Sequence, residues 1–155
     1  MAGHASATTG RYVRRVPVRS RLVASEKTIL VVEDEEAVRQ LAIAQLESAG
    51  YSTLAAPDAE EALALLQEHS PAAILLDLDM PGMGGLDMLA ELKKGASELP
   101  PVIAFSAYVD IDLVFSKTME LGVRAHVLKP YNRRDLLDAV SDALNGRSWR
   151  SYTGR

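Results

Sequence analysis

The chain has 155 residues, about one domain, and its 48% hydrophobic and 25% charged residues are typical of a globular protein that buries a core. No apolar run reaches the ~18–20 residues of a membrane span, and the absence of cysteine excludes disulfides, thiolate metal sites and cysteine nucleophiles. The net charge of −4 divides into +5 for residues 1–27, +3 for residues 146–155 and −12 for the segment between them. Because a nucleic-acid-binding domain needs a basic face, an acidic centre argues against nucleic acid as a partner.

Residues 1–27 are rich in Ala, Ser, Thr, Gly and Arg and show no sustained hydrophobic period. We expect a flexible basic tail there, although an arginine-rich, acid-poor start is also a feature of transit peptides. A single domain is expected over residues 28–146 and a short tail over residues 147–155. The lack of cysteine suits a reducing compartment, and we expect a cytoplasmic protein.

Five short apolar runs follow the tail, each of about four or five residues, as expected for buried strands. They cover residues 29–32, 51–55, 73–76, 102–105 and 125–128. The segments between and after them have helical spacing and helix-end signals, and they cover residues 38–49, 57–66, 85–94, 111–121 and 132–144. Strands that alternate with helices predict a doubly wound α/β domain, in which helices cover both faces of a parallel sheet.

Polar residues follow four of the five runs: Glu33-Asp34, Asp77, Ser106 and Lys129. Carboxyl ends of parallel strands lie at one edge of the sheet, which is where such folds bind ligands. Oxygen-only ligands favour Mg²⁺, which takes one or two carboxylates and often a phosphate oxygen. A lysine and a hydroxyl suit the same phosphate, and a carboxylate beside them is a feasible nucleophile that forms an aspartyl phosphate.

Four motifs carry a family resemblance: ILVVEDEEAVRQL, AAILLDLDMPGMGGLDML, PVIAFSAY and AHVLKPYNRRDLLDAV. Through them, residues 28–145 resemble the receiver domain of bacterial two-component response regulators, of the single-domain chemotaxis type. The resemblance implies a flavodoxin-like sheet of five parallel strands in the order 2-1-3-4-5. The lack of GxGxxG after the first strand excludes a nucleotide-binding Rossmann domain.

The resemblance also implies a role for each residue of the site. Asp77 matches the phosphoacceptor, Asp34 a direct Mg²⁺ ligand and Glu33 its acidic neighbour. The backbone carbonyl of Asp79 completes the metal shell. Ser106 matches the residue that binds a phosphoryl oxygen, and Lys129-Pro130 matches a lysine–proline pair whose peptide bond is usually cis.

The sequence departs from the family pattern at two places, and each departure leads to a further expectation. His126 stands where the family usually has an aromatic residue, so Ser106 and His126 would form the switch pair. The alternative is that His126 lies exposed on an edge strand. The stretch between Ser106 and Lys129 is about one residue longer than usual, which predicts an irregular fourth helix or approach loop.

The expected function is a stand-alone phosphorylation switch rather than an enzyme in the usual sense. A histidine kinase or histidine phosphotransfer protein would phosphorylate Asp77 in a Mg²⁺-dependent reaction, and a downstream protein target would read the result in a phosphorelay. One alternative is a phosphatase of the haloacid-dehalogenase type, because Asp77-Leu78-Asp79 imitates its DxD motif, but here the other acids lie upstream of the nucleophile. The other is a pseudo-receiver that only binds, which the complete residue set argues against.

Overall fold

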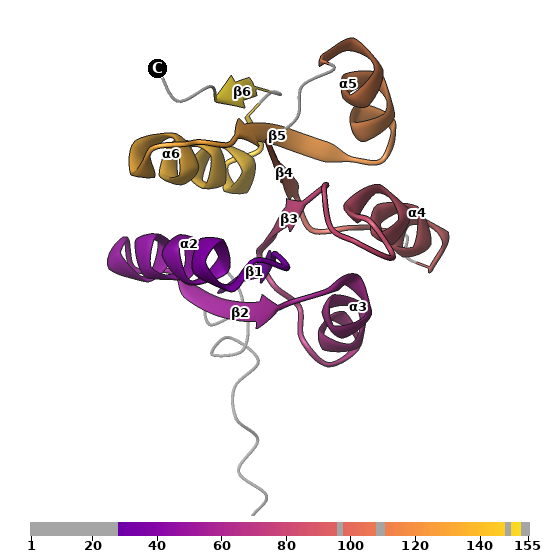
Figure 1. Cartoon of the computed structure of the whole chain (residues 1–155), viewed down its shortest axis with the longest axis horizontal. Helices are drawn as coiled ribbons and strands as arrows, with labels where there is room; N and C mark the ends of the chain where they lie inside the picture. The colour runs from indigo at the N-terminus through magenta and orange to yellow at the C-terminus, as the bar shows by residue number, and fades with distance from the viewer. Residues whose placement is uncertain (1–27, 96–97, 108–110, 148–149, 153–155) are drawn as a thin grey trace, which may run out of the picture.

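The computed structural model describes residues 28–95, 98–107, 111–147 and 150–152 (Figure 1). The expected N-terminal tail lies outside these residues, as do residues 148–149 and 153–155 of the expected C-terminal tail. The elements in chain order are β1 (Thr28–Val32), α2 (Glu36–Ser48), β2 (Ser52–Ala56), α3 (Ala59–Glu68), β3 (Ala73–Asp77), α4 (Gly85–Gly95), β4 (Val102–Ser106), α5 (Ile111–Glu120), β5 (Val123–Leu128), α6 (Arg133–Leu144) and β6 (Arg150–Tyr152). Among the described residues, no helix combines the length and the apolar character that crossing a bilayer requires.

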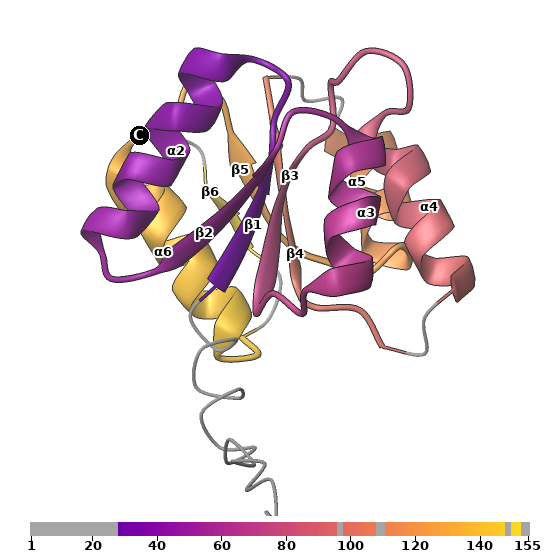
Figure 2. The same ribbon diagram turned by 90° about the horizontal axis from the view of Figure 1, so that it is seen from below.

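All strands are parallel, in the order β2-β1-β3-β4-β5-β6. Helices α2 and α6 cover one face of the sheet and α3, α4 and α5 the other (Figure 2). Each face has its own apolar cluster, one centred on Val31, Leu75 and Phe105 and the other on Leu30, Leu76 and Met88. Burial on both faces explains why the central strands β1, β3 and β4 are nearly continuous apolar runs. The flavodoxin-like order 2-1-3-4-5 is confirmed.

Local signals fix where helices α3, α6 and α4 begin. The Asp58 carboxylate accepts a hydrogen bond from the Glu61 backbone N–H (2.8 Å), and the Asn132 side chain accepts one from the Asp135 N–H (2.9 Å). Both are side-chain caps, which satisfy backbone donors that a helix start leaves unpaired. At the start of α4, a Cβ on Gly85 would lie 2.4 Å from the Asp77 carbonyl oxygen, so only glycine lets this helix pack against the end of β3.

The sixth strand is a difference from the expected sheet. Residues 150–152, within the segment expected to be a tail, pair with β5 from Ala125 to Val127. The Tyr152 hydroxyl donates to the Asp142 carboxylate on α6, and Arg147 forms an ion pair with the same carboxylate at 3.0 Å. Three residues are too few to show a strand period, so the sequence carried no signal for β6. As a result, β5 is not an edge strand.

A β-bulge in β5 lies within the stretch between Ser106 and Lys129, although not where an irregularity was expected. Val102 pairs with Val123 but Ile103 pairs with Ala125, which leaves Arg124 as the extra residue. The expectation had placed the irregularity in the fourth helix or its approach loop, of which residues 108–110 lie outside the described part. Arg124 is exposed while both of its neighbours are buried. The bulge therefore absorbs one residue without turning the strand's buried side chains outward.

Candidate functional site

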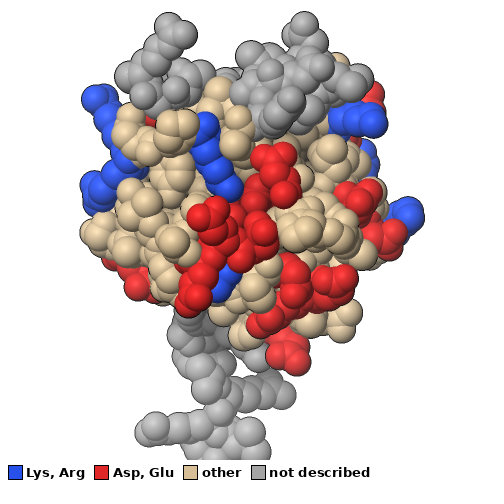
Figure 3. All heavy atoms as spheres, in the orientation of Figure 1, with Lys and Arg blue, Asp and Glu red and all other residues tan. Residues whose placement is uncertain are grey.

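Acidic side chains gather at the centre of the molecular face seen in Figure 3, over the region where β1 and β3 lie. Exposed acidic residues at this end of the sheet include Asp79 after β3 and five that follow β1 or begin α2 and α3: Asp34, Glu35, Glu36, Glu60 and Glu61. Two more carboxylates, those of Glu33 and Asp77, are buried beneath this surface at 1% and 2% exposure. Buried carboxylates need compensating partners, so the contacts below the surface are informative.

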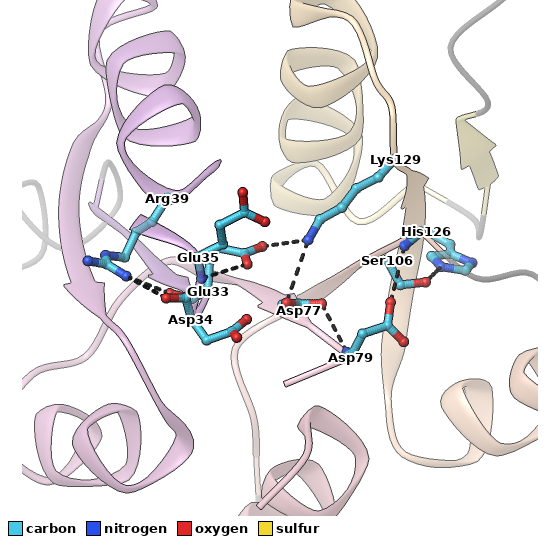
Figure 4. A network of polar contacts seen from close by, with 10 residues as sticks. Glu33, Asp34, Glu35, Arg39, Asp77, Asp79, Ser106, His126 and Lys129 are labelled. Atoms are coloured by element: carbon cyan, nitrogen blue, oxygen red, sulfur yellow. Dashed lines mark hydrogen bonds and ion pairs between the residues drawn. The ribbon is translucent and has the colours of Figure 1, made fainter. Parts of the chain in front are cut away.

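The ends of four strands bring these partners together (Figure 4). Glu33 follows β1, Asp77 ends β3, Ser106 ends β4 and Lys129 follows β5. The Lys129 Nζ lies 2.7 Å from Glu33 Oε2 and 3.5 Å from Asp77 Oδ2. It also lies 4.4 Å from the centre of the Phe105 ring, a cation–π contact. One lysine therefore compensates two buried carboxylates, and its peptide bond to Pro130 is cis, as the resemblance implied.

This compensation is incomplete, as the acidities of the two carboxyl groups show. Burial raises the pKa of Glu33 to about 7, even though its hydrogen bond from Lys129 acts in the opposite direction. Burial also raises the pKa of Asp77 above its ordinary value, against the hydrogen bond from the Asp79 N–H. Both shifts mean that the charged forms are poorly stabilised at this edge. A bound cation would stabilise them.

Three carboxylates are placed to hold such a cation. Oxygen atoms of Glu33, Asp34 and Asp77 lie within 4.8 Å of one another, and Asp34 is exposed to solvent. The donors are all carboxylate oxygens, the ligand type that Mg²⁺ prefers. The residues present therefore fit a hard divalent cation, and the exposure of Asp34 keeps the cluster in contact with solvent.

The side chain of Asp79 is turned away from these three carboxylates. Its Oδ2 accepts a hydrogen bond from the Ala107 backbone N–H at 3.1 Å, while its own N–H donates to Asp77 Oδ1 at 2.9 Å. Only its backbone carbonyl was expected to serve the metal, and that role stays a prediction.

Ser106 and His126 are in direct contact. The Ser106 Oγ and His126 Nε2 atoms lie 3.2 Å apart, and the His126 side chain is half-buried. Burial lowers the pKa of His126 below its ordinary 6.5, so the neutral ring is favoured. The alternative of an exposed histidine on an edge strand is wrong, because β6 covers that side of β5 and the ring points at Ser106.

Sequence reasoning missed two groups of this site. The Arg39 guanidinium donates to the backbone carbonyls of Glu33 at 2.8 Å and Asp34 at 3.5 Å, which fixes the acidic loop. Its position one turn into α2, just after the acidic run, was a usable signal. The Ala107 N–H is a backbone group, and no side-chain pattern identifies it.

Comparisons with known proteins agree with this geometry. The response regulator receiver domain matches residues 29–141. Sporulation initiation phosphotransferase F of Bacillus subtilis is 33% identical over 116 residues, which cover 75% of this chain and 92% of the relative. The phosphate regulon transcriptional regulatory protein PhoB of Pseudomonas aeruginosa is 33% identical over 119 residues, and the matched segment spans only 52% of that relative.

A solved structure supports the same assignment. The chemotaxis response regulator CheY4 of Vibrio cholerae matches with a TM-score of 0.69 at 25% identity, covering 75% of this chain and 97% of that one. The family match spans well over half of the chain, and it includes every strand end that contributes to the site. The chain therefore belongs to the response regulator receiver domain family.

Proposed function

We propose that this chain accepts a phosphoryl group on Asp77 from the phosphohistidine of a histidine kinase or histidine phosphotransfer protein, in a Mg²⁺-dependent reaction. The observation that carries the proposal is the position of Asp77. Its buried carboxylate ends a central strand, 3.5 Å from the Lys129 ammonium and within reach of the acidic pair after β1. A nucleophile, a cation and a set of oxygen ligands thus surround one point.

In this reaction an Asp77 oxygen attacks phosphorus as the bond from phosphorus to the donor's imidazole nitrogen breaks. Glu33, Asp34 and Asp77, with the Asp79 carbonyl, would hold Mg²⁺, which supplies charge neutralisation for the phosphoryl oxygens. Lys129 supplies a second positive charge, and the Ser106 hydroxyl donates a hydrogen bond to a phosphoryl oxygen. Arg39 keeps the acidic loop in place by holding its carbonyls.

Signalling then follows from the pair of Ser106 and His126. A phosphoryl oxygen competes for the Ser106 hydroxyl, which now lies 3.2 Å from His126 Nε2. A change in that contact alters the position of His126 on β5 and biases the domain between two states. We propose that a downstream protein target reads this change, and that the chain works as a stand-alone cytoplasmic switch rather than as an enzyme with turnover.

Incubation with acetyl phosphate tests the proposal directly. Intact-mass measurement should show the gain of one phosphoryl group in the presence of Mg²⁺ and no gain in the presence of a chelator. Hydroxylamine should remove the added group, because acyl phosphates are cleaved by this nucleophile. A chain that folds and binds Mg²⁺ but gains no mass is a pseudo-receiver, and the proposal is then wrong.

A further inference from the structure

The Lys129 side chain crosses part of the sheet to reach the acceptor (Figure 4). Lys129 follows β5 and Asp77 ends β3, so one strand, β4, lies between them. Neighbouring strands are about 4.8 Å apart, so the lysine must bridge roughly 10 Å. Its ammonium nevertheless lies 3.5 Å from Asp77 Oδ2. The residue of β4 at this level therefore determines what the lysine side chain lies on.

That residue is Phe105. It pairs with Asp77 on one side and with Val127 on the other. Because paired residues of parallel strands point to the same face of a sheet, the Phe105 ring lies between the strand that carries the acceptor and the strand that leads to the lysine. The Lys129 Nζ lies 4.4 Å from the centre of this ring. The lysine therefore reaches Asp77 across an aromatic face.

The ammonium thus has an aromatic partner as well as two carboxylate partners. Glu33 Oε2 at 2.7 Å is closer to it than Asp77 Oδ2 at 3.5 Å, so the carboxylates alone would draw the ammonium towards Glu33. The face of an aromatic ring attracts a cation, and the attraction is larger where water is excluded. The Lys129 side chain is 19% exposed and Phe105 is fully buried. The ring therefore opposes the displacement towards Glu33 and keeps the charge beside Asp77.

Tyr131 keeps the Phe105 ring in this orientation. The two ring centres lie 5.0 Å apart with their planes at 63°, an edge-on contact that aromatic pairs favour. The Tyr131 hydroxyl is buried, and within the described part of the chain no hydrogen-bond partner meets it. Burial and the charge of Glu33 raise the pKa of Tyr131 to about 12, so its hydroxyl is neutral. The ring of Tyr131 rather than its hydroxyl is therefore the part that supports Phe105.

We propose that Phe105 is a positioning residue for phosphoryl transfer, because its ring face holds the Lys129 ammonium beside Asp77, and that Tyr131 fixes this ring. The inference rests on the proposed function and extends it to two aromatic side chains that act through the lysine. A phosphoryl group brings three strong acceptor oxygens, which compete with Glu33 for the ammonium. They do not compete with the ring, which accepts no strong hydrogen bond. The contact with Phe105 therefore persists while the lysine changes its anionic partner.

A packing role for Phe105 makes a different prediction. If the ring only fills space beneath the lysine, any ring of the same shape serves equally well. Site-specific replacement of Phe105 by phenylalanines that carry one or three ring fluorines keeps the shape closely and progressively removes the negative potential of the ring face. Phe105→Leu removes the ring altogether. The series separates electrostatic positioning from packing, and the fluorinated chains remain informative if Phe105→Leu does not fold.

The experiment measures the rate of mass gain of the full chain from acetyl phosphate at saturating Mg²⁺. We expect the rate to fall about twofold with one fluorine, about fivefold with three and about tenfold in Phe105→Leu, the order of a partly desolvated cation–π contact. Tyr131→Leu should lower the rate about threefold, and Tyr131→Phe, which keeps the ring, should restore it. Tyr51→Leu is the matched control and should stay within about twofold, because Tyr51 packs against the same apolar cluster at the opposite end of the sheet.

The proton resonances of the Lys129 ε-methylene group provide a readout that a general loss of packing would not give. The ring current of Phe105 should shift them upfield in wild type, and this shift should disappear in Phe105→Leu. Equal phosphorylation rates for wild type and the chain with three fluorines, or Lys129 resonances without a ring-current shift, would overturn the proposal. A wild-type chain that gains no mass from acetyl phosphate contradicts the proposed function itself, a result distinct from equal rates among the variants.

Discussion

The interior of the central strands and their carboxyl-terminal ends are equally buried, but they bury opposite kinds of side chain. Ile74, Leu75 and Leu76 of β3 are fully buried, and Asp77, the next residue, is 2% exposed. Each large apolar side chain stabilises the fold by about 1.5–3 kcal/mol through its burial. The raised pKa values of Asp77 and Glu33 show that burial disfavours their charged forms. The strand interiors therefore stabilise the fold, whereas burying two carboxylates at the strand ends opposes that stabilisation.

The largest effect should come from removing the nucleophile at this edge. Asp77→Asn keeps the shape of the side chain but replaces the attacking oxygen with a neutral amide. We expect the acetyl-phosphate mass gain to vanish while the protein stays folded, which intact mass and circular dichroism together would establish. Stoichiometric phosphorylation of this variant would show that the acceptor lies elsewhere.

Removing the compensating cation should affect both chemistry and stability. Lys129→Met leaves Glu33 and Asp77 without their positive partner, and we expect the phosphorylation rate to fall about 100-fold. Breaking a mostly buried pair should also lower the free energy of unfolding by about 3 kcal/mol, measured in urea.

A double variant sharpens the result for the lysine. Glu33→Gln combined with Lys129→Met removes one of the uncompensated charges and should recover part of the lost stability without recovering phosphorylation. If the single and double variants unfold at the same urea concentration, Lys129 does not compensate Glu33 energetically.

Removing the exposed carboxylate of Asp34 should weaken metal binding and leave the fold intact. Asp34→Ala removes one of three clustered carboxylates, so Mg²⁺ affinity should fall about tenfold or more, as measured by calorimetry. Because mutual repulsion is relieved, the stability of the metal-free variant should equal or exceed that of wild type. Glu60→Gln is the matched control, and unchanged Mg²⁺ affinity in Asp34→Ala would place the metal site elsewhere.

The smallest expected effect concerns His126. Because burial lowers its pKa below 6.5, the unfolded chain binds a proton there more readily than the folded one. The contribution of neutral His126 to stability is therefore complete above pH ~6.5 and is lost as pH falls below that value. The pKa of Glu33 is raised to about 7, so its contribution to stability changes with pH in the opposite direction. Comparing wild type with His126→Phe removes this effect, because Glu33 is present in both proteins. Wild type should lose more stability between pH ~7.5 and ~5.5, and equal losses would show that His126 stays solvated.

The same contrast explains what could be predicted from the sequence. The strand interiors were readable because burial on both faces leaves a local mark, an uninterrupted apolar run, and the helix caps Asp58 and Asn132 act within three residues. The convergence of Asp77, Ser106 and Lys129 followed from parallel topology, which places the end of every strand at one edge.

The remaining features of the fold and the site depend on contacts between residues distant in the sequence, and such contacts produce no pattern within a short segment. Strand β6 has three residues, and its pairing with β5 rests on contacts such as that of Tyr152 with Asp142, which are visible only in the folded chain. The bulge at Arg124 depends on the register between β4 and β5. The position of the Asp79 carboxylate on a backbone N–H depends on how two loops meet. Contacts between residues distant in the sequence therefore determine the details of the site, whereas local patterns determine the strands and helices that position it.

The assignment of Asp77 as the phosphoacceptor is best tested by locating the phosphoryl group on the chain. After reaction with acetyl phosphate and Mg²⁺, the acyl phosphate can be trapped by borohydride reduction and the modified residue identified by peptide mass spectrometry. We predict that Asp77 alone is modified. Modification of Asp34 or Asp79 instead, or an unmodified Asp77 in protein that has gained a phosphoryl group, would contradict it.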